Sequence, residues 1–146
     1  MYLYTIGFTQ KSAAEFFSLL TENDVAVLVD VRLNNSSQLA GFSKGRDLEY
    51  FLRTICGCRY VYAPELAPAK EIFDAYKGKK ISWPEFADRF RALILERGAL
   101  DAFPAAPGGA ERVCLLCSEP TPEHCHRRLL AEMLREKQPE IIINHL

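Results

Sequence analysis

Reactive side chains crowd into one stretch of the chain, which reads VCLLCSEPTPEHCHRR. Cys117 ends an apolar run and Glu119 follows it, and Cys125, His126 and Arg127 come together shortly afterwards. A thiol beside an imidazole is the usual arrangement of a nucleophile and its base. An acid can carry a proton, and an arginine can bind an anion. These residue types therefore indicate a thiol-dependent transferase or hydrolase.

The elements around this stretch are expected to place its side chains at the end of a sheet. Residues 113–117 are short, continuous and apolar, which is typical of a strand buried on both faces. Residues 121–123 read Thr-Pro-Glu and predict a helix start. Cys125 would then lie in the first helical turn, where the helix dipole lowers a thiol pKa. We therefore predict Cys125 as the nucleophile, His126 as its base and Glu119 as the proton carrier.

Two other interpretations of the same groups stay open. Cys117, Cys125 and His126, with Glu119 or His124 as a fourth ligand, offer the donor set of a tetrahedral zinc site. Alternatively, both cysteines are small hydrophobic side chains of the core. The leading interpretation needs no cofactor, and zinc is its alternative.

A second group of polar side chains follows the apolar strand predicted over 25–31. Asp30 and Arg32 are two residues apart, so they project to the same side of an extended chain. A carboxylate at the end of a buried strand must be paired, so the two form either a structural ion pair or part of a pocket. In the second case Arg32 and Arg127 bind an anion, and Phe42 and Lys44 lie at the pocket mouth.

Strands and helices alternate along the chain, which predicts a single α/β domain over residues 1–146. We expect a mainly parallel sheet of about four to five strands flanked by helices. A long loop over 32–45 interrupts the alternation. The expected strands cover 2–6, 25–31, 59–62, 113–117 and 141–146, and the clearest helices cover 12–20, 47–56 and 82–98.

Composition narrows the classes of function. The chain has 146 residues, 49% of them hydrophobic and 25% charged, with a net charge of -1. A chain with this net charge has no overall positive field that would bind long nucleic acid. No apolar run approaches the length of a membrane span. The first residues do not resemble a signal peptide, and the five cysteines are an odd number. We therefore expect a cytoplasmic protein with reduced thiols.

Three functions remain open on these grounds. The first is an enzyme acting on a small substrate that bears phosphate or carboxylate. The second is a module that binds nucleic acid or a nucleotide through Arg32, Lys44, Arg46, Arg127 and Phe42. The third is a structural zinc domain. The sequence does not reveal the reaction or the oligomeric state.

Several short motifs are similar to those of the domain of unknown function 488 family. They are TIG at 5–7, LVDVR at 28–32, Phe42, Tyr60, Leu66, CSE at 117–119 and CHR at 125–127. The resemblance implies a single α/β domain, usually cytoplasmic, whose motif residues gather at one end of the sheet. It implies no reaction, because none is established for the family.

The chain also departs from that family's pattern. Many members carry His-Ser after the first glycine, but this chain has Phe8 and Thr9, so that loop supplies no histidine base. The motif LVDVR resembles, more weakly, the rhodanese-like sulfurtransferases, whose catalytic cysteine would correspond to Cys117. Residues 118–122 contain no glycine, unlike the tight loop that holds the cysteine in those enzymes.

Overall fold

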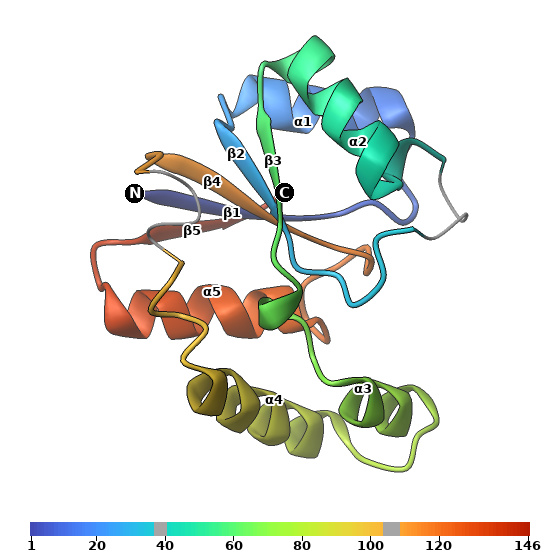
Figure 1. Cartoon of the computed structure of the whole chain (residues 1–146), viewed down its shortest axis with the longest axis vertical. Coiled ribbons are helices and arrows are strands. Elements are labelled where there is room, and N and C mark those ends of the chain that lie inside the picture. The colour runs from blue at the N-terminus through green and yellow to red at the C-terminus, as the bar shows by residue number, and fades with distance from the viewer. Residues whose placement is uncertain (37–40, 104–108) are drawn as a thin grey trace.

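A five-stranded sheet forms the centre of the molecule (Figure 1). The computed structural model describes residues 1–36, 41–103 and 109–146. All strand pairs in the sheet are parallel, and the strand order is β3-β2-β4-β1-β5. The prediction of one α/β domain with a parallel sheet is therefore confirmed. The strands are β1 (Tyr2–Gly7), β2 (Val27–Asp30), β3 (Arg59–Tyr62), β4 (Arg112–Cys117) and β5 (Ile142–His145).

Helices cover both faces of the sheet (Figure 1). One face packs against α1 (Ala13–Glu22) and α2 (Gly45–Phe51), and the other against α4 (Trp83–Arg97) and α5 (His126–Lys137). A further helix, α3 (Lys70–Lys77), packs against α4 and contains no fully buried residue. Apolar side chains on both sides of the strands explain why β2 and β4 read as continuous apolar runs.

Local signals in the sequence account for most helix ends. The Ser12 side chain accepts a hydrogen bond from the amide three residues on at 3.1 Å, and Ser82 does the same at 3.3 Å. Gly57 and Gly98 both have φ of 61° and end their helices in the left-handed conformation. The predicted helix over 47–56 is α2 continued by one π-helical turn, Leu52–Cys56.

The predicted helix start at residues 121–123 is wrong. The helix α5 begins at His126, and Cys125 precedes it as an extended N-cap whose side chain makes no capping hydrogen bond. The Cys125 amide instead donates to the Pro122 carbonyl at 3.2 Å, which closes a turn. A Thr-Pro pair suits a turn as well as a helix start, and here the turn forms. Cys125 is consequently outside the helix.

The order of the strands creates a crevice at their carboxyl ends. The helices that follow β1 and β2 along the chain are α1 and α2, which lie on one face, and the helix that follows β4 is α5, which lies on the other. Since β4 lies between β2 and β1, neighbouring strands send the chain to opposite faces. Ligands of open α/β sheets bind where this happens. The loop expected over 32–45 begins here, but its residues 37–40 lie outside the described residues.

Candidate functional site

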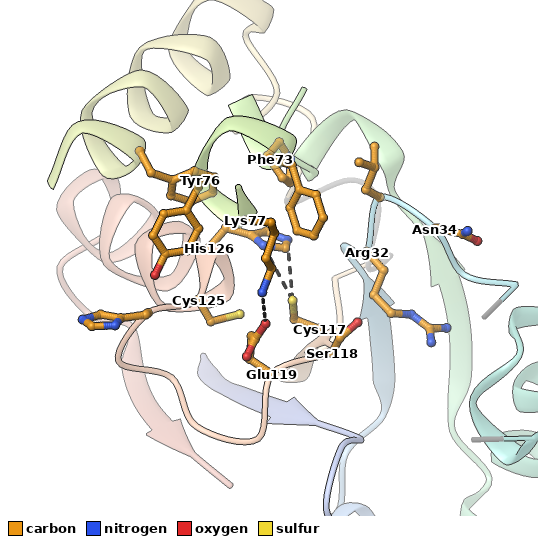
Figure 2. A pocket seen from close by; sticks show the side chains of 14 residues that line it. Arg32, Asn34, Phe73, Tyr76, Lys77, Cys117, Ser118, Glu119, Cys125 and His126 are labelled. Carbon is orange, nitrogen blue, oxygen red and sulfur yellow. Dashed lines mark hydrogen bonds and ion pairs between the residues drawn. The ribbon is translucent and has the colours of Figure 1, made fainter. Parts of the chain in front are cut away.

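A cavity of about 250 Å³ opens at the carboxyl ends of β2 and β4 (Figure 2). Helices α3 and α4 supply an aromatic wall, and the strand ends and the N-terminal end of α5 supply a polar one. The cavity has the mixed lining of a small-molecule site, and its volume lies just below the range of about 300–1,000 Å³ that is usual for such sites. Its aromatic wall contains Phe73, Tyr76 and Phe86, and its polar wall contains Cys117, Glu119, Cys125 and His126.

Cys117 and His126 lie together in this wall. The Cys117 Sγ is 3.6 Å from His126 Nδ1, and His126 Nε2 is 2.7 Å from the carbonyl oxygen of Val31. A carbonyl can only accept a hydrogen bond, so Nε2 donates, and in the neutral ring Nδ1 is the nitrogen that carries the lone pair. The Cys117 sulfur is also 3.9 Å from Nε2, so it lies beside the imidazole ring and not along the Nδ1 lone pair. The Phe90 ring lies 5.5 Å from the imidazole and packs beside it. The site thus combines a thiol, an imidazole and a carbonyl that orients the imidazole, which are the groups that a nucleophile and its base require.

The surroundings of the two thiols at the cavity shift their pKa values in opposite directions. The hydrogen bond with Cys125 lowers the pKa of Cys117; the Arg127 charge and the amides of Ser118 and Glu119 also lower it, against the effect of burial. Burial raises the pKa of Cys125 well above its ordinary value, and the neighbouring Cys117 raises it further. We expected a lowered pKa for Cys125, but its pKa is raised, because Cys125 precedes the helix and is buried away from solvent. These two directions favour ionisation of Cys117 over ionisation of Cys125.

Arg127 is a cation in the protein interior, with 0% of its surface exposed. Its Nη1 donates to the Glu119 carbonyl oxygen at 2.5 Å and lies 3.6 Å from Cys125 Sγ, and its Nε is 3.4 Å from Thr5 Oγ1. No carboxylate among the described residues pairs with it, and its Nη2 has no partner there. A buried cation without a counter-charge is costly. The positive charge of Arg127 lowers the pKa of the Cys117 thiol and so favours a negative charge there.

Gly7 lets this arrangement form at the end of β1. A Cβ at this position would lie 1.7 Å from the Glu119 carbonyl oxygen and 3.0 Å from Arg127 Nη1. The loop after β4 therefore approaches the first strand more closely than any side chain would permit. The glycine of the TIG motif is required by this close approach.

Asp30 and Arg32 form a buried ion pair. The carboxylate accepts hydrogen bonds from Arg32 Nε and Nη2, both at 2.8 Å, and from the Tyr60 hydroxyl at 2.6 Å. Arg32 Nη2 also donates to the Ser43 carbonyl at 2.6 Å. Figure 2 shows the Arg32 guanidinium directed away from the two thiols. Part of Arg32 lines the cavity and Asp30 does not, so the geometry matches a structural pair.

Lys77 is a site residue that the sequence did not single out. Its Nζ pairs with Glu119 Oε1 at 2.6 Å, across the cavity from one wall to the other (Figure 2). Partial burial lowers the pKa of Lys77, but the hydrogen bond and charge of Glu119 outweigh it and raise that pKa above its ordinary value. A lysine in the last turn of a short helix is an ordinary feature, so no local signal marks it.

Two residues predicted for the pocket mouth lie elsewhere. Phe42 packs against Phe16 and Phe17, at 5.4 and 5.8 Å between ring centroids, on the face that carries α1. Lys44 precedes α2, and neither it nor Phe42 lines the cavity. Arg32 and Arg127 are buried, so they do not form one surface with Phe42 and Lys44. The structure therefore does not bring together the residues that were predicted to bind nucleic acid.

The thiols and the imidazole could also hold a metal ion. The ligand atoms of Cys117, Cys125 and His126 all lie within 4.8 Å of one another. Tetrahedral zinc, with Zn–S of about 2.3 Å and Zn–N of about 2.0 Å, holds its sulfur and nitrogen ligands about 3.5 Å apart, which is close to the distance seen here. The candidates for fourth ligand are engaged elsewhere: Glu119 pairs with Lys77, and the His124 ring packs on Trp83. The group suits a metal that keeps one position open.

Comparisons with known proteins identify the family. No curated protein and no solved structure matches the chain, so the weaker likeness to rhodanese-like sulfurtransferases is not confirmed. Within the described ranges, none of the helices combines the length and apolar character that crossing a bilayer requires. A family model with the description "Domain of unknown function DUF488" matches residues 12–134. This match covers most of the chain, and the chain therefore belongs to the DUF488 family.

Proposed function

We propose that this protein is a thiol-dependent transferase or hydrolase that acts on a small anionic substrate. One observation carries the proposal: Cys117 Sγ is 3.6 Å from His126 Nδ1, in the wall of a cavity, while the Val31 carbonyl fixes the other ring nitrogen. The same logic of nucleophile, base and orienting group operates in cysteine and serine hydrolases on unrelated folds.

The sequence favoured Cys125 as the nucleophile, and the geometry supports Cys117 instead. His126 Nδ1 takes the proton from the Cys117 thiol, and the thiolate attacks the electrophilic centre of the substrate. The bond to the leaving group then breaks with its electron pair, and that group takes the proton that His126 holds, with Glu119 as the carrier. Water or an acceptor molecule next attacks the group bound to Cys117, and the bond to the sulfur breaks and restores the thiolate. Cys125 donates a hydrogen bond to the Cys117 sulfur in this scheme. Arg127 holds the negative charge in place by its own positive charge.

The anionic part of the substrate is assigned to Lys77. Arg32 is neutralised by Asp30, and Arg127 is fully buried and does not line the cavity. Lys77 is 48% exposed and lines the cavity, so a phosphate or carboxylate can compete with Glu119 for its ammonium group. The exchange would also free the Glu119 carboxylate for proton transfer.

Alkylation with a matched pair of reagents tests the nucleophile. Iodoacetamide is neutral and iodoacetate is anionic, and peptide mass spectrometry locates the labelled cysteine. We expect Cys117 to be labelled first, with a pH midpoint below the value of about 8.5 for a free thiol. Cys114 is the internal control, because it lies on the same strand but is fully buried on the opposite face. Equal labelling of Cys114 and Cys117, or an ordinary midpoint for Cys117, would remove the support for the nucleophile.

The same reagents test the role of Lys77. Substitution Lys77→Gln should lower the ratio of the iodoacetate rate to the iodoacetamide rate at Cys117, because only the anionic reagent is attracted to the ammonium group. Lys70→Gln is the matched control, since Lys70 lies on the same helix and pairs only with Asp74 at the surface. A ratio that both variants leave unchanged argues against Lys77 as the anion site.

A zinc site is the second candidate, and the close approach of three ligand atoms favours it. A bound metal would supply Lewis-acid chemistry at the open position. The test is the zinc content of protein purified without chelator or affinity tag. Stoichiometric zinc that is lost in Cys117→Ser and kept in Cys114→Ser supports this candidate, and clearly less than stoichiometric zinc argues against it.

A further inference from the structure

We propose that Cys117 and Cys125 form a reversible disulfide when a small hydroperoxide enters the cavity, with Cys125 as the resolving thiol. This inference rests on the proposed function, because it takes Cys117 as the nucleophile. It adds a second class of substrate, the peroxide, and a means by which that substrate switches off the site.

The positions of the two sulfurs permit the bond. Both Sγ atoms lie within 4.8 Å of each other and of the His126 ring, and both cysteines line the cavity. A disulfide needs the sulfurs about 2.05 Å apart, so a rotation about the side-chain bonds must close the remaining gap. Cys125 precedes α5 as an extended residue, and its side chain is not engaged in capping the helix. Rotation of this side chain therefore costs the helix no capping bond.

The chemistry balances with the peroxide as the oxidant. The Cys117 thiolate attacks one peroxide oxygen, the O–O bond breaks, and the departing oxygen leaves as water or an alcohol after taking a proton. This gives a sulfenic acid on Cys117. The Cys125 sulfur then attacks the Cys117 sulfur, the S–O bond breaks, and water leaves with the Cys125 proton. Two thiols are oxidised and one hydroperoxide is reduced.

The cavity limits which cysteines can react in this way. Cys117 is 5% exposed and Cys125 2% exposed, so an oxidant reaches them through a cavity of about 250 Å³. Hydrogen peroxide passes easily, and bulky oxidants do not. Cys58 and Cys114 are buried in the core on the other face and do not line this cavity. Cys56 is partly exposed, and it does not line the cavity either. The reaction should therefore be confined to one pair of the five cysteines.

Disulfide formation would also switch the site off. It removes the thiolate from beside His126 Nδ1, and it consumes the Cys125 thiol, whose sulfur lies 3.6 Å from Arg127 Nη1. Small thiols could restore the site by exchange at the disulfide. Cys117 of the oxidised protein should consequently fail to react with iodoacetamide until the protein has been treated with a reductant.

Peptide mapping of the whole protein tests the inference. After treatment with hydrogen peroxide, proteolysis without reductant should yield a peptide in which Cys117 is joined to Cys125, and dithiothreitol should release it. In Cys125→Ser, oxidation should stop at a Cys117 sulfenic acid that dimedone traps. Cys114→Ser is the matched control and should still form the disulfide. Circular dichroism of each variant confirms that it is folded.

The outcomes separate this inference from the proposed function. If Cys117 reacts rapidly with iodoacetamide but peroxide gives only sulfinic or sulfonic acid, the inference is overturned and the proposed function stands. A disulfide between other cysteines, such as Cys56 and Cys58, also overturns it. If Cys117 does not react with iodoacetamide either, the proposed function fails first.

Discussion

The buried ion pair of Asp30 and Arg32 gives the sharpest test of the energetics. Asp30→Asn keeps the shape of the side chain and removes its charge. The carboxylate accepts both guanidinium hydrogen bonds of Arg32 at 2.8 Å, the Arg32 amide at 3.1 Å and the Tyr60 hydroxyl at 2.6 Å. Without the charge, Arg32 is a cation that is 2% exposed and has no counter-ion. Breaking a buried pair in this way costs about 3–5 kcal/mol.

Urea unfolding followed by the fluorescence of the single tryptophan, Trp83, measures this cost. With a slope of about 1.5 kcal/mol per molar urea, the midpoint should fall by about 2–3 M. Asp74→Asn is the matched control: its pair with Lys70 is at the surface, with the two side chains 55% and 75% exposed. That change should cost less than about 0.5 kcal/mol. A loss below about 1 kcal/mol for Asp30→Asn, or equal losses in both variants, would refute the reasoning.

Three further predictions concern the packing around the site. Gly7→Ala should lower the free energy of unfolding by about 2–4 kcal/mol in the same urea assay, because the new Cβ would lie 1.7 Å from the Glu119 carbonyl oxygen. A loss below about 1 kcal/mol would contradict this prediction. Burial raises the pKa of Cys58 to about 12, so a smaller fraction of this thiol is ionised at any given pH. Iodoacetamide should therefore leave Cys58 unlabelled at pH 9 in the folded protein. Labelling as fast as in the protein unfolded by urea would contradict this prediction. Phe90→Ala should lower the free energy of unfolding by about 3–5 kcal/mol, because Phe90 is fully buried. It should also slow the alkylation of Cys117, because the His126 ring would lose the side chain that packs beside it. Unchanged stability would contradict this prediction.

Much of the fold could be predicted from the sequence because strong local patterns determine it. The buried strands β2 and β4 are continuous apolar runs, and the predicted strands match the observed ones to within two residues at most ends. The two-residue spacing of Asp30 and Arg32 placed both on one side of the chain, and they do pair. Strand order was not readable, because it depends on contacts between distant segments.

The sequence indicated which residue types would line the candidate site, but it did not indicate how their side chains would be arranged. The crowding of Cys117, Glu119, Cys125 and His126 around one cavity agrees with the prediction from a short stretch of sequence. The pKa order of the two thiols depends on burial and on neighbouring charges, which only the folded chain supplies. Lys77 reaches the cavity because α3 packs on α4, and that contact has no signature in the sequence.

The place of β4 between β2 and β1 has a consequence for biosynthesis. The first two strands emerge early from the ribosome, yet neither pairs with the other, and the strand that joins them begins only at Arg112. A nascent chain shorter than this leaves both edges of β1 and one edge of β2 unpaired, and such edges are prone to aggregate. Folding should therefore wait for the last quarter of the chain, and truncated translation products should depend on chaperones to stay soluble.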